Sequence, residues 1–235
     1  MAKRKSTAYM TSGEQIAGTV FFMIYLVVLP FATAPLFRWA GVLLGVTISS
    51  GLQNIIYYYV LFAVTIIIFH GFLGRTSRQL ADNLGTACRT LVIGLIALYG
   101  LNELVYRLTN LVVTNRTNLN DVAISAQIQD APHMTMLIVL LLAPFVEEVL
   151  FRGLVFGNLK HKSRTVAYAV SCLLFALLHV WQFAVKRQDI TYFLLMVQYL
   201  VPGLVLAWAY DHTGTLWSSV LLHAAANALS VWASM

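Results

Sequence analysis

Two adjacent glutamates, Glu147 and Glu148, and an arginine, Arg152, lie in an otherwise apolar stretch of the sequence, A-P-F-V-E-E-V-L-F-R-G. A charged side chain near the centre of a lipid bilayer costs about 3 kcal/mol even on lenient scales, so three charges this close together need a reason. On a helix, Glu148 and Arg152 lie one turn apart and can form an ion pair, while Glu147 points about 100° away. One carboxylate is then neutralised, and the other is available as a catalytic base.

Pro144 precedes these carboxylates by about one helical turn. Because proline removes a backbone hydrogen bond, we expect the helix to bend here and to admit water to the glutamates. The structural alternative for Glu148 and Arg152 is a buried ion pair that only holds helices together. That alternative explains a second, adjacent glutamate less well, so Glu147 is the better candidate for chemistry.

Two later apolar stretches carry further polar groups. His179 ends the sequence F-A-L-L-H, and His223 and Asn227 frame the sequence H-A-A-A-N. Residues four apart share one face of a helix, and the three alanines between them allow a neighbouring helix to approach closely. Each of these residues alone is more typical of a hydrogen bond between helices. Together with two carboxylates, they favour a polar site inside a helix bundle.

These residue types can perform hydrolysis by two routes. Glu147 beside His179 can hold and deprotonate a water molecule, while His223 and Asn227 donate hydrogen bonds to the oxyanion that forms on a carbonyl. Alternatively, Glu147, His179 and His223 could bind a divalent metal such as zinc and leave one position open for water. The zinc-peptidase signature H-E-x-x-H is absent from the sequence. Spacing alone does not choose between the two routes.

Composition places this site in a membrane. The chain has 235 residues, of which 60% are hydrophobic and 10% charged, and this excludes an ordinary soluble domain. The net charge of +6 comes from basic residues scattered between apolar stretches, which favours contact with the lipid bilayer and argues against nucleic acid as a partner. Two cysteines, Cys88 and Cys172, are too few for a disulfide framework or a cysteine-ligated metal site.

The elements that must position the site are transmembrane helices. An all-α polytopic bundle of about seven to eight of them is predicted, with an intramembrane polar active site, because each apolar stretch is near the ~20 residues that cross a bilayer. The seven main stretches are 15–34, 52–73, 88–105, 133–157, 166–183, 192–210 and 216–235, with a short or interfacial eighth at 41–50. We divide the single membrane domain into an N-terminal cytoplasmic segment (1–14), N-terminal helices (15–131) and a catalytic core (132–235).

The basic residues also predict an orientation. Placing the N-terminus in the cytoplasm puts nine Lys and Arg residues inside and five outside, as the positive-inside rule requires. Lys3, Arg4 and Lys5 contribute to the inside count. Glu103 and Arg107 are expected to form an interfacial ion pair. Asp211 is expected to be solvated in a short turn, 211–214, with no special role.

Taken in order, E-E-x-x-x-R (Glu147, Glu148, Arg152), F-x-x-x-H (Phe175, His179) and H-x-x-x-N (His223, Asn227) resemble the CPBP family of intramembrane proteases. This is the CAAX protease and bacteriocin-processing family, also called ABI, and the resemblance covers about residue 132 to the C-terminus. It implies that Glu147 and His179 activate water. It also implies that His223 and Asn227 stabilise the oxyanion and that Glu148 and Arg152 support them. The family is often described as metal-dependent, so a metal such as zinc remains open.

Three functions follow as hypotheses. The first is an intramembrane endopeptidase that cleaves a membrane-associated peptide or protein, and the lack of further domains suggests a prokaryotic plasma membrane. The second is a non-catalytic immunity or scaffold protein with the same bundle. The third is a small transporter whose buried carboxylates and histidines relay protons. The third lacks the paired, Gly/Pro-broken stretches expected in two halves of such a protein.

Overall fold

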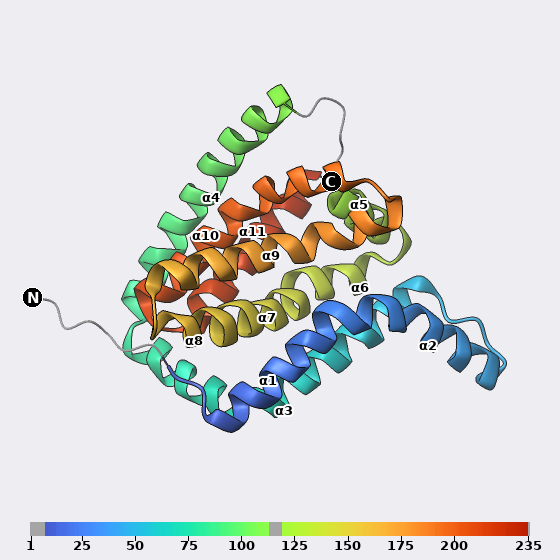
Figure 1. The fold of residues 1–235 in the computed structure, drawn as a ribbon, viewed down its shortest axis with the longest axis horizontal. Helices are drawn as coiled ribbons and strands as arrows, with labels where there is room; N and C mark the ends of the chain where they lie inside the picture. The colour runs from blue at the N-terminus through green and yellow to red at the C-terminus, as the bar shows by residue number, and fades with distance from the viewer. Residues whose placement is uncertain (1–7, 113–118, 235) are drawn as a thin grey trace, which may run out of the picture.

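The computed structural model describes residues 8–112 and 119–234. Apart from short connections these residues are helical, and no strand occurs among them, so the predicted all-α bundle is confirmed. Figure 1 shows long helices running side by side in the bundle, with α2 and the far end of α4 projecting from it. Lys3, Arg4, Lys5 and Arg116, on which part of the predicted orientation depends, lie outside the described residues.

The first helix is a single continuous rod. It consists of α1 (Ser12–Met23), the π-helical segment η1 (Ile24–Val28) and α2 (Leu29–Leu44). Its 33 residues extend for about 50 Å, longer than the ~30 Å hydrocarbon core of a bilayer. The predicted short helix at 41–50 does not form, because residues 41–44 continue α2 and Gly45 ends it in a left-handed conformation with φ 65°.

Two long helices follow. They are α3 (Ser50–Asp82) and α4 (Leu84–Val112), and a shorter helix, α5 (Leu119–Asp130), leads into the second half of the chain. The backbone of α3 is bent at Phe69, whose φ and ψ are −106° and 17°. Beyond the bend, the N–H of Phe72 donates to the carboxylate of Glu14 at 2.6 Å, and Arg75 also binds that carboxylate at 2.6 Å. These bonds hold the start of α1 against α3.

The glutamates lie on a composite helix from Pro132 to Lys160. Its parts are α6 (Pro132–Leu137), the π-helical segment η2 (Ile138–Leu142), α7 (Ala143–Glu148), the π-helical segment η3 (Val149–Phe156) and α8 (Gly157–Lys160). The chain then forms α9 (Arg164–Arg187), the 3₁₀ turn η4 (Ile190–Leu195), α10 (Met196–Thr213) and α11 (Leu216–Ser234).

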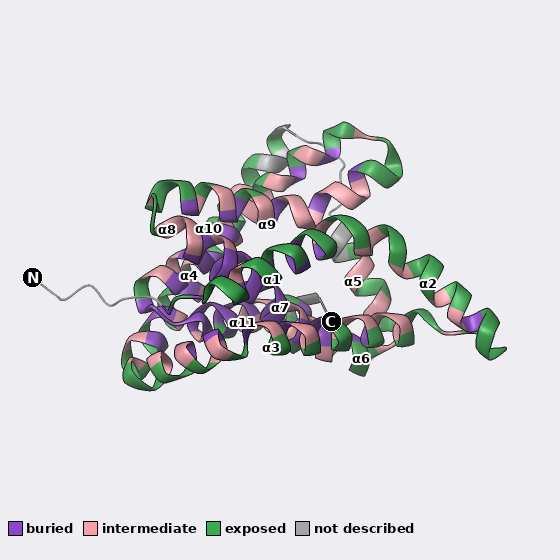
Figure 2. Ribbon diagram, turned by 60° about the horizontal axis from the view of Figure 1, so that its bottom comes forward, coloured by how far each residue is buried: buried purple, intermediate pink, exposed green. Residues whose placement is uncertain are grey.

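The composite helix occupies the centre of the bundle. In its most apolar stretch 67% of the residues are buried, against 17–33% in the other long apolar helices. It packs against α3, α9, α10 and α11. Figure 2 shows the buried residues gathered around α7, with the outward faces and α2 exposed. The charged side chains midway along this helix are therefore surrounded mainly by protein.

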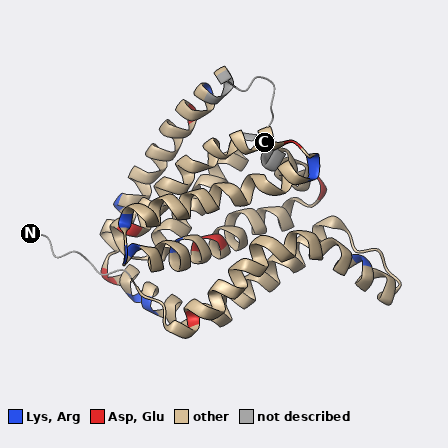
Figure 3. Ribbon diagram, viewed as in Figure 1, with Lys and Arg blue, Asp and Glu red and all other residues tan. Residues whose placement is uncertain are grey.

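Six helices among the described residues are long and apolar enough to cross a membrane. The last predicted stretch, 216–235, corresponds to α11, which packs against α4, α10 and α7. Figure 3 shows charged residues mostly near helix ends, with an acidic stretch midway along the composite helix. Length, composition and this charge distribution are those of an integral membrane protein.

Two polar clusters join the helix ends. Asp211, predicted to be a solvated turn residue, lies instead within α10, and its side chain is only 2% exposed because it binds Lys160 and Arg164. At the start of α11, the N–H of Leu216 donates to the hydroxyl of Thr76 on α3 at 2.7 Å. Because that N–H has no partner within its own helix, this bond fixes α11 relative to α3.

Candidate active site

The local structure around the two glutamates is a short α-helical segment between two π-helical ones. π-Helical bulges inside α-helices are frequent at functional sites, since they change which side chains share a face. Glu147 is 7% exposed, and Glu148 and Arg152 are fully buried. The four-residue spacing of Glu148 and Arg152 is retained through η3, so their predicted ion pair forms, with 3.0 Å between Nη1 and Oε1.

The buried charge of Arg152 is compensated by three kinds of contact. Its Nη1 donates to Glu148, and its Nη2 donates to the backbone carbonyl of Gly203 on α10 at 3.2 Å. The guanidinium also lies over the ring of Phe175, 4.3 Å from its centroid. An uncompensated buried charge would be costly, so these contacts explain how the arginine is tolerated inside the bundle.

His223 joins this ion pair from α11. Its Nδ1 lies 2.9 Å from Oε1 of Glu148, the same oxygen that receives Arg152. A carboxylate can only accept, so Nδ1 carries the proton, and Nε2 of a neutral ring is left as an acceptor. The sequence analysis placed His223 beside Glu147, but the structure pairs it with Glu148 instead. Glu148 therefore has two partners, one from its own helix and one from α11.

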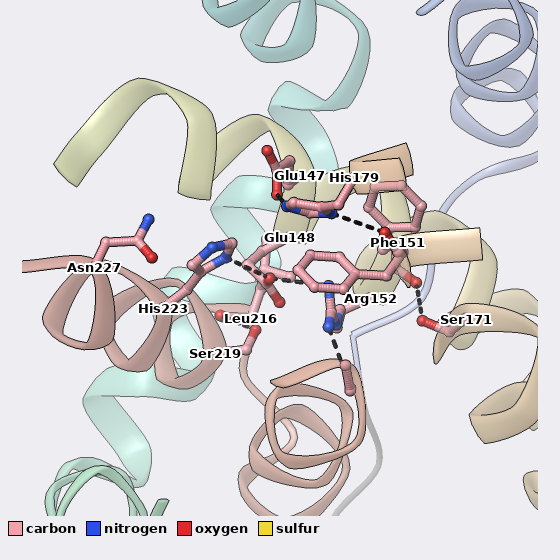
Figure 4. A network of polar contacts seen from close by, with 12 residues as sticks. Glu147, Glu148, Phe151, Arg152, Ser171, His179, Leu216, Ser219, His223 and Asn227 are labelled. Atoms are coloured by element: carbon pink, nitrogen blue, oxygen red, sulfur yellow. Dashed lines mark hydrogen bonds and ion pairs between the residues drawn. The ribbon is translucent and has the colours of Figure 1, made fainter. Parts of the chain in front are cut away.

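Glu147 faces His179 on α9. Their Oε2 and Nε2 atoms are 3.9 Å apart, too far for a direct hydrogen bond. The packing of α9 on the composite helix brings the two side chains together. Oε2 of Glu147 is buried and has no hydrogen-bond partner among the described residues. Figure 4 shows the two side chains facing each other above the pair of Glu148 and Arg152.

The orientation of His179 is fixed from several sides. Its Nδ1 contacts the backbone carbonyl of Phe175 at 2.8 Å, so Nδ1 carries the proton and Nε2 of a neutral ring is an acceptor. Phe175 packs against one part of the ring at 4.6 Å, and Tyr199 of α10 stacks on it at 4.5 Å with 24° between the ring planes. A carboxylate and an imidazole acceptor 3.9 Å apart are suited to receive both hydrogens of one water molecule.

Asn227 lies one helical turn beyond His223 on α11, as Figure 4 shows. Its Nδ2 donates to the backbone carbonyl of Val139 at 2.9 Å. An amide nitrogen carries two hydrogens, so one N–H remains for another acceptor. The structure therefore brings the six predicted residues into two neighbouring groups. Glu147 and His179 form the first. Glu148, Arg152 and His223 form the second, and Asn227 lies beside it.

The possible metal set does not converge. Among residues 8–112 and 119–234, no three His, Cys, Asp or Glu side chains are arranged so that they could hold a metal ion. Glu147 and His179 face each other, but His223 is directed to Glu148. These side chains do not fit the three-ligand zinc site that the sequence left open, and we derive no step through a metal.

Some contributors to the site were missed by sequence reasoning. Tyr25 on η1 and Tyr57 and Tyr58 on α3 all lie close enough to Glu147 to interact with its charge. Tyrosines are common in membrane helices, so their sequence positions gave no signal. Tyr199 and Gly203 were also missed, although Pro202 beside Gly203 marks an irregular point of α10.

Comparisons with known proteins point to one family. Residues 129–229 match the family model described as Type II CAAX prenyl endopeptidase Rce1-like, which covers every residue of the site described above except the N-terminal tyrosines. The chain is also 29% identical over 115 residues to UPF0177 protein YxdF of Lactococcus lactis. That match covers 49% of this chain and 56% of the relative, so the chain spans about half the length of the curated relative. No solved structure matches the chain.

Proposed function

We propose, from the premise that residues 129–229 form a domain of the Rce1-like CAAX prenyl endopeptidase family, that this protein is an intramembrane endopeptidase. Its substrate is a membrane-associated peptide or protein. The observation that supports this most strongly is the facing pair of Glu147 and His179, two acceptors 3.9 Å apart inside a largely apolar bundle. A structural ion pair explains why Glu148 and Arg152 are buried, but it does not explain why Glu147 is buried.

In this proposal Glu147 is the base. A water molecule donates one hydrogen to Glu147 and the other to Nε2 of His179, which orients its lone pair toward the substrate carbonyl. Glu147 takes the proton as the water oxygen bonds to the carbonyl carbon, and a tetrahedral oxyanion forms. When the C–N bond breaks, Glu147 returns that proton to the leaving amine, and the products are one carboxyl terminus and one amino terminus.

The oxyanion is stabilised by His223 and Asn227. Since Nδ1 of His223 already donates to Glu148, Nε2 can donate to an oxyanion only when the ring carries a second proton. Asn227 contributes its remaining N–H. Fixed donors of this kind act where charge develops and are worth about 10²–10³ in rate for each donor removed.

In this proposal the protein lies in a prokaryotic plasma membrane with its N-terminus in the cytoplasm, and the excess of basic residues on that side favours this orientation. Peptide pheromones, bacteriocin precursors and prenylated or other membrane proteins are the substrate classes to be tested. Each is a peptide held near the bilayer, where a site enclosed by α7, α9 and α11 can reach it.

The test uses the purified protein in liposomes with a library of lipid-anchored and single-span peptides, and mass spectrometry detects new peptide termini. Glu147→Gln should abolish cleavage while thermal unfolding is unchanged. The exposed residue Glu103 provides the control Glu103→Gln, which should cleave normally. Cleavage by Glu147→Gln at the wild-type rate would refute the proposal, and a biological effect that survives this substitution would favour the immunity or scaffold function. Chelator treatment should leave cleavage intact.

A further inference from the structure

One backbone carbonyl beside the site has lost both of its normal donors. In an α-helix, the carbonyl of Val139 would accept the N–H of Ala143, four residues on. In η2, however, the N–H of Ala143 donates to Ile138, five residues back. Continuing this wider register would pair Val139 with residue 144, which is a proline and has no N–H.

Asn227 supplies the missing donor from another helix. Its Nδ2 lies 2.9 Å from the carbonyl oxygen of Val139. The π-helical register and Pro144 together leave this carbonyl without a backbone donor, and Val139 is half-buried where η2 packs against α11. An unpaired carbonyl in such surroundings costs free energy, so the side chain of Asn227 has a structural partner that does not depend on any substrate.

We infer that Asn227, besides the donor role proposed for its second N–H, is a positioning residue whose bond to Val139 sets the register of α11 on the composite helix. His223 precedes Asn227 by one turn and binds Glu148, which lies nine residues after Val139. The two bonds therefore fix α11 at two points along the composite helix. A slip of α11 by one residue would break both bonds and would turn His223 away from the site.

Because both residues determine whether the Val139 carbonyl has a donor, Pro144 and Asn227 should be energetically coupled. Replacing Asn227 by Ala leaves the Val139 carbonyl unpaired, whereas replacing Pro144 by Ala provides a backbone N–H that can pair with it. The cost of Asn227→Ala should therefore be smaller in the Pro144→Ala background. Pro35, which also lies inside a helix but is exposed and distant, provides the matched control Pro35→Ala.

The experiment measures reversible unfolding in detergent for Asn227→Ala in three backgrounds. We expect the unfolding equilibrium constant to rise about tenfold in the wild-type and Pro35→Ala backgrounds, and about twofold with Pro144→Ala. Equal increases in all three backgrounds would overturn the inference. If Asn227→Ala alone fails to fold, the double variant with Pro144→Ala should fold, and failure of that double variant, while Pro144→Ala alone folds, would overturn it equally.

Cleavage separates positioning from direct catalysis, and this arm alone rests on the proposed function. If Asn227 acts through the register of α11, Pro144→Ala should restore at least part of the kcat that Asn227→Ala loses. A bond to Val139 restored by the backbone cannot replace a donor to the oxyanion. Asn227→Ala could instead lose the same kcat in the wild-type and Pro144→Ala backgrounds while the stability coupling is present. The bond would then serve stability only, and the claim that it positions the site would be overturned.

Discussion

The chain contains two Glu–Arg pairs at the same four-residue spacing in opposite surroundings. Glu103 and Arg107 are 2.6 Å apart with both side chains more than half exposed, and Glu148 and Arg152 are 3.0 Å apart with both fully buried. The sequence analysis predicted both pairs. The environment decides their value, because an exposed pair is screened by solvent and a buried one is not.

Glu148→Gln should therefore destabilise the protein by about 3–5 kcal/mol, since it leaves the guanidinium of Arg152 buried without a counter-charge. The matched variant Glu103→Gln should change stability by less than about 1 kcal/mol. Thermal and denaturant unfolding in the same detergent compare the two. An equal loss of stability in the two variants would show that burial does not make the Glu148–Arg152 pair more important than the exposed pair.

The stacking of Tyr199 on His179 gives a second prediction for single residues. Tyr199→Leu removes the aromatic face that fixes the imidazole plane, so kcat should fall about tenfold, in line with a misoriented catalytic group. Tyr199→Phe keeps that face and should retain most of the wild-type kcat. A kinetic comparison in liposomes decides, and a similar loss in both variants would assign the effect to the hydroxyl group instead of the ring.

At this scale, the sequence was sufficient for the residue types and for two pairings, Glu148 with Arg152 and Glu147 with His179, but not for the partners of His223 and Asn227. The motifs identified all six polar residues, because charges and amides in apolar stretches are conspicuous. The partners of His223 and Asn227 depend on how the helices pack and on the backbone register, which the sequence does not show directly. His223 binds Glu148 instead of Glu147. Asn227 binds a backbone carbonyl that lacks a helical donor because η2 adopts a π-helical register.

Among the elements, α9 and α10 approach each other closely at Gly203. A Cβ added at Gly203 would lie 3.3 Å from both Cα and Cβ of Cys172, so the helices would have to separate. That movement would withdraw the Gly203 carbonyl from Arg152. We expect Gly203→Ala to cost about 1–3 kcal/mol through overpacking.

Gly100 on α4 is the control for this substitution, since a Cβ there meets nothing within 4 Å. Gly100→Ala should be neutral or stabilising by up to about 1 kcal/mol, because alanine has the higher helix propensity. Unfolding of the two variants side by side measures the difference. If Gly203→Ala proved as stable as Gly100→Ala, close packing at Gly203 would not be required.

The predicted elements were largely correct because apolar length is a strong signal for transmembrane helices. The exception was the short segment predicted at 41–50, because residues 41–44 continue α2 and Gly45 ends it. The three π-helical segments were not predictable, since they depend on side-chain packing between helices and not on local propensity. The bend predicted at Pro144 stays a prediction; in the structure Pro144 lies just after the π-helical segment η2 and has no N–H to donate to the carbonyl of Val139.

For the whole molecule, the orientation can be tested at opposite ends of α9. Lys162 and Arg187 are both exposed, and the positive-inside assignment places Lys162 in the cytoplasm. After Cys88 and Cys172 are replaced by Ala, a membrane-impermeant maleimide added to intact cells should label Arg187→Cys and not Lys162→Cys. Permeabilised cells should show labelling of both variants. The reverse pattern in intact cells would invert the topology.

The central claim is that Glu147 and His179 activate a water molecule for peptide-bond hydrolysis inside the bundle. The most direct measurement follows cleavage in H₂¹⁸O by mass spectrometry, with wild type and Glu147→Gln compared on the same peptide. Hydrolysis by an activated water predicts one ¹⁸O atom in the new carboxyl terminus for the wild type and no product for Glu147→Gln. Product formed without ¹⁸O, or formed equally by Glu147→Gln, would contradict the account.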